Sequence, residues 1–492
     1  MTHQDNIPSS WLSLQLGQVI DYGQTEKVEP ENISSETWVL ELEDIERDTS
    51  RLLKRLTYAE RPSKSTKNSF SPRDVLYGKL RPYLNKVIYA DASGVCSTEI
   101  IPLKPNLAVD SRYLFHWIRH PEFRAYTSQV SHGVNMPRLG TEAGRQTPFI
   151  LAPINEQRRI ADKLDRVLAR VDAANEHLSR VAPLIKRFRQ SVLAAAFKGK
   201  LTEEFRKQEE LTPIDETVKR SPEIPRPNRY NSRTDAVIPG DFALSVNQSN
   251  MIAPDGWKWL PMVDVARMES GHTPSRSFPE YWNGDVPWIG IADARLHHTS
   301  TIEDTIQHTN NLGLENSAAR LLPAGTVCVS RTASVGYVVK MGKPMATSQD
   351  FVNWVCGPAV NPDWLKWLFV AEEAALYRFG KGSTHTTIYF PEWLSLHVAL
   401  PSLEEQSEIV RRVEKLFAFA DRLEERLSQA QAAVQKLTPA LLAKAFRGEL
   451  VPQDPNDEPA SELLKRLQES RANDTKPRRA RKPRATSAGE SP

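Results

Sequence analysis

A segment that occurs twice constrains this chain more than any other feature. The 51 residues from Leu151 to Leu201 recur without a gap from Leu400 to Leu450, which lies 249 residues further along a chain of 492. About fifteen of the aligned residues are identical. Solenoid repeats have periods of about 20 to 50 residues. The long period therefore indicates a larger unit, one globular domain plus one helix, that is used twice.

Apolar residues in both copies step alternately by four and three positions, which is typical of a coiled-coil seam. One helix cannot bury so narrow a stripe alone, so each copy is the expected partner of the other, in either a parallel or an antiparallel pairing. Gly199 and Gly448 predict C-terminal caps, whereas Pro183 and Pro439 are expected to kink or break the helices. The predicted seam residues are Ile160, Leu164, Val167, Val171, Leu178, Ile409, Val413, Leu416, Leu423 and Leu427.

Two globular stretches of similar size remain outside the helical copies. Both contain short β-rich runs, bounded by Gly, Pro, Asn and Asp, together with helical patterns, which predicts mixed α/β (α+β) folds. Landmarks such as Gly133 with Gly382 keep step, so the two domains are expected to be diverged copies. The predicted organisation is a domain at 1–150, a helical spacer at 151–201, a linker at 202–253, a second domain at 254–400, a second spacer at 401–451 and a basic, largely disordered tail at 452–492.

Cysteine content, hydropathy and charge limit the possible classes. Three cysteines far apart and without a CxxC pair support neither a disulfide framework nor a zinc ribbon, and favour a reducing cytoplasm. No stretch of about 18 apolar residues is present, so a membrane span is not expected. Six of the nine residues 476–484 are basic, which leaves 64 − 6 = 58 basic against 61 acidic residues elsewhere. Nucleic-acid binding would therefore depend on local patches or on partner subunits.

Basic, aromatic and amide side chains interleave in the first domain, in a pattern that suits phosphate contact and base-edge recognition. A solvated surface loop is the alternative interpretation for this stretch, and plain turns are the alternative for the Ser/Thr-rich loops of the second domain. The candidates in the first domain are Lys79, Arg81, Tyr83, Asn85, Lys86, Asn135 and Arg138. Those in the second are Thr273, Ser275, Arg276, Arg331, Thr332, Ser334, Ser383, Thr384 and His385.

Motifs for chemistry within the chain are missing or incomplete. Asn361-Pro-Asp-Trp364 lacks the second proline of an amino-methyltransferase motif, and Gly336 to Pro344 has the wrong spacing for a phosphate loop. His116 and His120 share a predicted helix face but have no evident third ligand for zinc. The sequence therefore predicts no catalytic residue, no metal site and no cofactor bound by this chain.

Several phrases, in order and in duplicate, carry a family resemblance. They include Asp74 to Lys86, Gly94 to Glu99, the Glu-Gln-x-x-Ile opening and Ala-Phe-(Lys/Arg)-Gly ending of both helical copies, and Gly448 to Pro459. In these phrases the chain resembles specificity subunits of type I restriction-modification systems. The resemblance implies two target recognition domains, separated by an antiparallel pair of helices and related by a pseudo-twofold repeat.

The same resemblance implies partners and a division of labour. Each domain would read one half of an asymmetric bipartite target in double-stranded DNA, and the helices would set the spacer between the halves. Two methyltransferase subunits using S-adenosylmethionine, and restriction subunits using ATP and magnesium, would carry the chemistry. The alternatives are an autonomous DNA nuclease or methyltransferase and a coiled-coil scaffold that binds DNA without sequence preference.

Overall fold

Two compact units make up the computed structural model. It describes residues 7–133, 135–212, 214, 232–332, 334–382 and 386–474. Unit 1 comprises residues 1–179 and 429–492, and unit 2 comprises residues 180–428. Each unit therefore contains one globular domain and a part of each of two long helices.

The two long helices are α4 (Ile154–Phe197) and α13 (Leu403–Phe446), of 44 residues each. The expected breaks at Pro183 and Pro439 are wrong, because both prolines lie inside continuous helix. Each proline removes one donor to the carbonyl four residues earlier. Those carbonyls belong to Ser179 and Gln435, which are exposed like the prolines themselves, so water can satisfy them.

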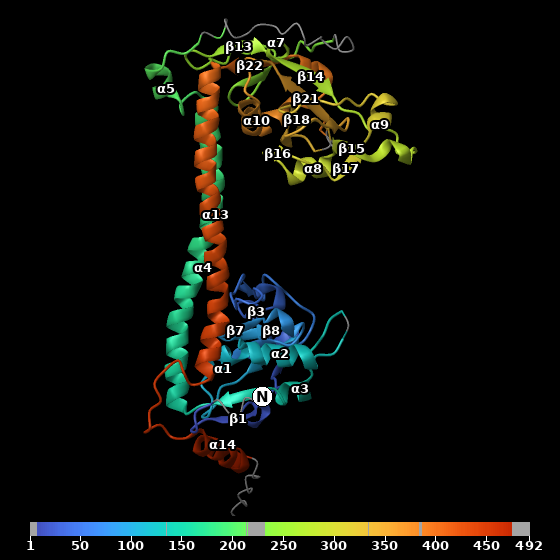
Figure 1. Cartoon of the computed structure of the whole chain (residues 1–492). Coiled ribbons are helices and arrows are strands. Elements are labelled where there is room, and N and C mark those ends of the chain that lie inside the picture. The colour runs from blue at the N-terminus through green and yellow to red at the C-terminus, as the bar shows by residue number, and fades with distance from the viewer. Residues whose placement is uncertain are drawn as a thin grey trace, which may run out of the picture. The chain divides into compact units, whose positions relative to one another are not determined.

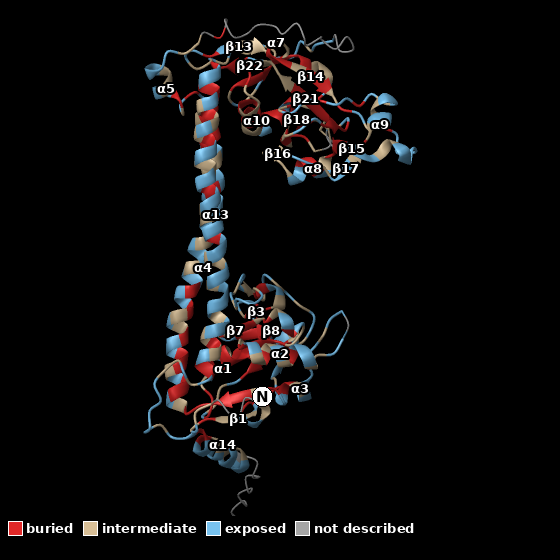
Figure 2. Ribbon diagram, in the orientation of Figure 1, coloured by how far each residue is buried: buried red, intermediate tan, exposed pale blue. Residues whose placement is uncertain are grey.

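The pairing of the two helices is antiparallel. In unit 1, Leu164 near the start of α4 shares a hydrophobic core with Leu442 near the end of α13. In unit 2, Val192 near the end of α4 shares a core with Ile409 near the start of α13. All ten predicted seam residues are buried or half-buried. Figure 1 shows α4 and α13 side by side, and Figure 2 shows buried and intermediate residues along both helices. Leu168, outside the predicted seam, is buried too, because this part of α4 also packs on the globular core of unit 1.

The globular part of unit 1 combines three β-sheets with short helices. A five-stranded sheet has the order β2-β5-β8-β3-β4, a three-stranded antiparallel sheet has the order β7-β6-β9, and β1 pairs with β10. The β3–β8 pair is parallel. The strands are β1 (Leu12–Gln15), β2 (Lys27–Val28), β3 (Trp38–Leu40), β4 (Leu56–Thr57), β5 (Lys67–Phe70), β6 (Val75–Gly78), β7 (Val87–Tyr89), β8 (Gly94–Cys96), β9 (Ile100–Leu103) and β10 (Pro148–Leu151). The helices are α1 (Ser111–Ile118), α2 (Pro121–Val130), α3 (Thr141–Arg145) and α14 (Ala460–Asp474), with 3-10 turns η2 (Leu16–Gln18), η3 (Pro30–Asn32), η4 (Leu42–Asp44) and η5 (Pro82–Leu84).

Unit 2 has the same kind of mixed architecture. Its sheets have the orders β11-β12-β22-β13, β14-β21-β18-β19-β16 and β17-β15-β20. The strands are β11 (Ile238–Pro239), β12 (Leu244–Val246), β13 (Lys258–Pro261), β14 (Ala266–Ser270), β15 (Trp282–Ile289), β16 (Thr301–Ile302), β17 (Gln307–Thr309), β18 (Val327–Ser330), β19 (Val338–Met341), β20 (Ala346–Thr347), β21 (Phe351–Cys356) and β22 (Leu396–Leu400). The helices are α5 (Glu203–Gln208), α7 (Met262–Val265), α8 (Ile291–Leu296), α9 (Asn311–Glu315), α10 (Pro362–Ala371), α11 (Glu373–Phe379) and α12 (Phe390–Leu394), with the turn η6 (Pro279–Tyr281).

The stretch 202–253, expected to be a linker, contributes structure to unit 2. It contains α5, β11 and β12, and β12 pairs with β22 in the four-stranded sheet. The buried carboxylate of Glu372 holds the turn between β11 and β12, because it accepts backbone N–H bonds from all four residues 241–244. Burial raises the pKa of Glu372 to about 7.

Both long helices end in the same way. Gly199 has φ +68° and Gly448 has φ +75°, the left-handed conformation of a helix C-cap. A side chain at Gly199 would collide with Pro254, and one at Gly448 would collide with Pro8. Glycine is therefore required twice over, by the backbone angle and by the close approach of a proline.

The segment after α13 covers the beginning of the chain in unit 1. The backbone N–H of Ala460 donates to the carbonyl of Ser10 at 2.9 Å. Leu463 and Leu467 of α14 are buried in the core that also contains Trp11. Residues after 474, where the basic stretch lies, are outside the described part of the chain.

Candidate nucleic-acid interface

A glutamine at the start of α4 fixes the first domain to its long helix. Gln157 is fully buried, and its Nε2 donates to the carbonyls of Ala108 and Ala152 at 2.9 and 2.8 Å. Its Oε1 accepts the N–H of Asp110 at 2.9 Å. The Asp110 side chain in turn caps α1. One side chain therefore links the helix of the repeat to a helix of the domain.

Gln406 makes the equivalent contacts at the start of α13. Its Nε2 donates to the carbonyls of Ala359 and Pro401, both at 2.9 Å, and its Oε1 accepts the N–H of Asn361 at 2.7 Å. Asn361 caps α10, as Asp110 caps α1. The identical glutamines in the duplicated segments thus have one structural role, which is to hold each domain in a fixed orientation on its helix.

The preceding glutamates are buried as well, but their donors differ. Glu156 accepts a bond from Trp11 Nε1 at 2.8 Å. Glu405 accepts bonds from Thr202 Oγ1 at 2.6 Å and from Arg206 Nη1 at 2.5 Å. The two units have therefore diverged around a shared framework.

A loop in the first domain carries several of the candidate contact residues, and we call residues 132–138 the first bridge loop. Arg138 forms β-bridges with His132, within the loop, and with Leu80, just beyond β6. The N–H of Arg81 also donates to the carbonyl of Pro137 at 2.7 Å. Gly133 turns the loop with φ +116°. Two candidate groups far apart in sequence, 79–86 and 135–138, therefore lie side by side.

The second domain repeats this arrangement in residues 381–387, the second bridge loop. Thr387 forms β-bridges with Lys381 and with Thr332, just beyond β18. Gly382 has φ +116°, the same angle as Gly133 in the first bridge loop. The predicted correspondence between these two glycines is confirmed by this geometry. Ser383, Thr384 and His385 lie in the loop but outside the described residues.

The first bridge loop and the strand end beside it present an exposed polar surface. Arg81, Asn135 and Arg138 are exposed, Tyr83 is 43% exposed and Lys79 is half-buried. Two of these residues are basic and exposed, one is an amide and one is aromatic, which are groups that bind phosphates and base edges. This surface remains a predicted contact surface.

Asn85 and Lys86 have inward positions. Asn85 is buried with φ +46°, and Lys86 Nζ donates to the carbonyl of Leu42 at 2.6 Å. Burial lowers the pKa of Lys86. In this conformation both residues support the strand end, and neither offers its side chain freely to a ligand.

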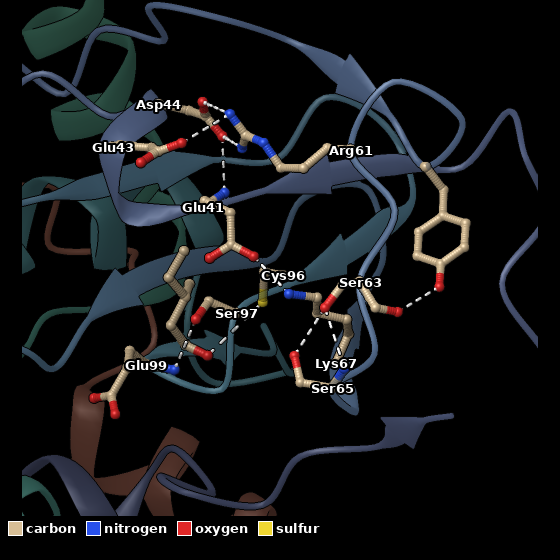
Figure 3. Close-up of polar contacts among 12 residues, drawn as sticks. Glu41, Glu43, Asp44, Arg61, Ser63, Ser65, Lys67, Cys96, Ser97 and Glu99 are labelled. Carbon is tan, nitrogen blue, oxygen red and sulfur yellow. Dashed lines mark hydrogen bonds and ion pairs between the residues drawn. The ribbon is translucent and has the colours of Figure 1, made fainter. Parts of the chain in front are cut away.

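A charged cluster beneath the same strand end fixes the segment from η4 to β5 (Figure 3). Arg61 binds Asp44 through both terminal nitrogens, at 2.5 and 2.9 Å. Asp44 also accepts the N–H of Glu41 at 2.8 Å, and the Glu41 carboxylate binds Lys67 Nζ at 2.6 Å. The bond to Asp44 raises the pKa of Arg61. Because these groups are buried or half-buried and mutually paired, the cluster provides a rigid base for the contact surface.

In the second domain, aromatic rings and Gln349 position the candidate arginines and threonines. Arg331 Nε donates to the Gln349 carbonyl at 3.1 Å, and its guanidinium lies 4.6 Å from the centre of the Phe390 ring. Thr273 Oγ1 donates to the Gln349 side chain. Thr332 hydrogen-bonds across the second bridge loop to Thr387 at 2.8 Å. Ser334, beyond the turn, is half-buried.

Arg276 and Ser275 form a neighbouring exposed turn. The Arg276 guanidinium lies 4.8 Å from the centre of Trp282 and 5.7 Å from that of Trp288, and donates to Gln307 at 3.0 Å. The sequence did not identify the residues that hold Arg331 and Arg276, which are Gln349, Phe390 and Trp282. It also did not identify Glu99 as the partner of Arg138 in the first domain. Glu99 belongs to one of the family-like phrases, but no sequence pattern connects it with Arg138.

The possible zinc pair is explained by packing. His116 is buried, with Nε2 2.7 Å from the Asp165 carboxylate, and burial lowers its pKa. The His120 ring stacks on Trp117 at 5.0 Å. Among the described residues, no group of three or more potential ligands is arranged for a metal ion.

No described helix is both long and apolar enough to cross a membrane.

Comparison with known proteins identifies the family. The model for "Type I restriction modification DNA specificity domain" matches residues 49–181 and 254–430, which is more than half of the chain. The chain belongs to this family. The two matched regions each contain one bridge loop and part of one long helix, so the family domain itself is duplicated here.

Individual members of the family support this assignment. The specificity subunit of the type I restriction enzyme EcoBI from Escherichia coli is 28% identical over 395 residues, covering 77% of this chain and 74% of the relative. A chain solved in work on complex assembly and conformational transition of the type I R-M system has a TM-score of 0.62 at 19% identity, covering 90% of this chain and 99% of its own. The HsdS subunit from Thermoanaerobacter tengcongensis has a TM-score of 0.56 at 20% identity, covering 91% and 100%. At these identities the solved structures establish the fold alone.

Proposed function

We propose that this chain is the DNA-specificity subunit of a type I restriction-modification complex and carries no catalytic step itself. The observation that carries the proposal is the repetition of one bridge loop at one strand end in two domains. Both loops have the same glycine angle and the same pair of β-bridges, yet the side chains around them differ. This combination suits two domains that bind DNA through the same backbone geometry but prefer different sequences.

Each domain would read one half of an asymmetric bipartite target in double-stranded DNA. Exposed arginines and amides match the acceptor and donor patterns of base edges in the major groove, while phosphate contacts fix the register. Arg138 in the first domain occupies the bridge position that Thr387 occupies in the second, and Lys79 occupies the position of Arg331, whose guanidinium lies beside Phe390. Different side chains at matching positions predict different half-sites.

The helix pair would set the number of unspecified base pairs between the half-sites. Gln157 and Gln406 attach each domain to the start of its own helix, so the orientation of each reader is fixed by buried hydrogen bonds. Helix length rises by about 1.5 Å per residue, and one DNA turn spans about 34 to 36 Å. A change in helix length is therefore a change in spacer length.

The chemistry would belong to partner subunits. Two methyltransferase subunits would use S-adenosylmethionine, and restriction subunits would use ATP and magnesium. Within the chain, the buried Cys96 and the packed His116 offer no accessible nucleophile or base for such reactions. The complex would act in the cytoplasm, where its DNA target lies.

Methylome sequencing tests the proposal directly. Cells that express the chain with its methyltransferase partner should methylate a bipartite motif that is lost when this gene is deleted. Exchanging residues 254–400 for the corresponding domain of another family member should alter one half-site and leave the other unchanged. Loss of both half-sites would contradict independent reading, and an unchanged methylome after deletion would refute the function. Equal binding to all duplexes would favour the non-specific scaffold, and DNA modification by the purified chain alone would favour an enzyme.

A further inference from the structure

The carboxylate of Glu99 is the side chain that orients Arg138 in the first bridge loop. Arg138 Nε lies 3.2 Å from both Glu99 oxygens. In the part of the chain that the structure describes, the terminal nitrogens of Arg138 make no hydrogen bond. The Arg138 side chain is 50% exposed, whereas that of Glu99 is 27% exposed. The acid therefore holds the inner side of the guanidinium and leaves the outer edge facing solvent.

Glu99 is itself held in place by the backbone of the same strand end. Its carbonyl accepts the N–H of Lys79 at 2.9 Å, and the carbonyl of Lys79 accepts the N–H of Leu139 at 3.0 Å. The N–H of Glu99 also donates to Ser97 Oγ at 3.4 Å. Lys79 is thus bonded both to Glu99 and to the segment that follows the first bridge loop, and the Glu99 side chain bonds to the loop arginine.

Guanidinium chemistry gives this geometry a consequence. Arginine has five N–H donors in a planar fork, and a bidentate contact to guanine O6 and N7 uses two that lie along one edge. Binding Nε to a carboxylate fixes the plane and leaves the Nη1–Nη2 edge available. A fixed plane also reduces the conformational entropy that an exposed arginine loses when it binds.

The second domain holds its arginine differently, which provides an internal comparison. Asp350 occupies the position of Glu99, because its carbonyl accepts the N–H of Arg331 at 2.8 Å just as the carbonyl of Glu99 accepts that of Lys79. The Asp350 carboxylate, however, accepts a bond from Ser348 Oγ at 3.0 Å. Arg331 is held instead by the carbonyl of Gln349 and the ring of Phe390. Thr387, an uncharged residue, forms the two bridges that Arg138 forms in the first domain, so among the described residues the pair of a carboxylate and a bridge-loop arginine is found in the first domain.

We propose that Glu99 is a positioning residue that sets base preference at one position of the first half-site, by presenting the terminal edge of Arg138 to a base pair with two adjacent acceptors. The inference rests on the proposed function of the chain. It assigns to Glu99 a role in specificity, although an acidic side chain beside DNA would by itself weaken binding.

The test measures base preference in the complete methyltransferase complex. A set of DNA duplexes is made in which each position of both half-sites carries each of the four base pairs in turn. These duplexes compete for binding to the complex at one fixed salt concentration, and discrimination is the ratio of affinities at a given position. Arg138→Gln should reduce discrimination at one position of the first half-site by about 5- to 150-fold, the range expected for one bidentate contact. Glu99→Gln should reduce it at the same position by about two- to fivefold, as expected for a partly exposed ion pair. Glu31→Gln, an equal charge change at an exposed site of the same domain, is the matched control.

The double variant separates positioning from other roles. If Glu99 acts through Arg138, then Glu99→Gln adds no further loss of discrimination in the Arg138→Gln background. Full additivity, no change in preference for Glu99→Gln, or loss at every position of the first half-site would each overturn the proposal, the last because Glu99 would then be needed for the fold of the domain. A wild-type complex without any base preference would instead contradict the proposed function.

Discussion

Replacing Gln157 by leucine tests whether the duplicated glutamines fix each domain to its long helix. The change keeps the side chain about the same size and removes three buried hydrogen bonds, to Ala108, Ala152 and Asp110. Three backbone groups left without partners cost about 1 to 3 kcal/mol each, and burying leucine returns about 1.5 to 3 kcal/mol. The expected net loss is about 4 kcal/mol in the free energy of unfolding of unit 1, the middle of the interval of about 0 to 8 kcal/mol that these ranges span.

Hydrogen exchange gives the most specific readout, because the second unit provides a control in the same molecule. Gln157→Leu should speed exchange in peptides covering 108–118 and leave peptides covering 359–371 unchanged. Gln406→Leu should have the reverse effect, since it removes the equivalent bonds to Ala359, Pro401 and Asn361. Gln435→Leu, at an exposed position of α13, should change stability by no more than about 0.5 kcal/mol. The reasoning fails if Gln157→Leu behaves like Gln435→Leu in urea unfolding and in exchange.

Two further predictions concern packing and pH. Phe446 lies 4.9 Å from the rings of both Tyr113 and Trp117, so Phe446→Ala should destabilise unit 1 by about 3 to 5 kcal/mol, measured by urea unfolding. Phe419→Ala, at a residue 47% exposed, should be close to neutral, and equal losses in the two variants would contradict the packing argument. Burial raises the pKa of Glu372 from 4.5 to about 7, so its protonated form is favoured in the folded state. The contribution of the protonated Glu372 side chain to stability is fully present below pH 4.5 and is lost as pH rises through about 7. The free energy of unfolding of unit 2 should therefore fall over this range. Glu372→Gln should flatten that dependence, and an unchanged slope would show that another group titrates.

The parts of the fold that could be predicted from the sequence are those that depend on local residue patterns. A four-and-three spacing specifies which helix face is buried, and a glycine at a helix end specifies a left-handed cap. Gly199 and Gly448 confirm the second pattern, since each has a positive φ at the end of its helix. The antiparallel direction needed the family resemblance, because the seam has the same spacing in either direction.

The parts that sequence missed depend on exposure or on pairing across long separations. Pro183 and Pro439 were expected to break their helices, but their exposed positions let water replace the lost partner. The partnership of Glu99 with Arg138 spans 39 residues and follows no period. Asn85 and Lys86 turn inward because η5 intervenes between strands, so an alternating strand pattern could not place their side chains.

The discontinuity of unit 1 has a consequence for synthesis on the ribosome. Its core takes Trp117 and Phe149 from the first third of the chain, and Phe446 and Leu463 from near the end. At a synthesis rate of about 5 to 20 residues per second, Phe446 is added roughly 15 to 60 seconds after Phe149, so the early aromatic residues lack this part of their core during that time. Unit 2, formed by the unbroken stretch 180–428, has all its residues before α13 is finished. The domain that is translated first is therefore completed last, and a nascent chain halted before Phe446 should expose the aromatic core of unit 1 to chaperones and proteases.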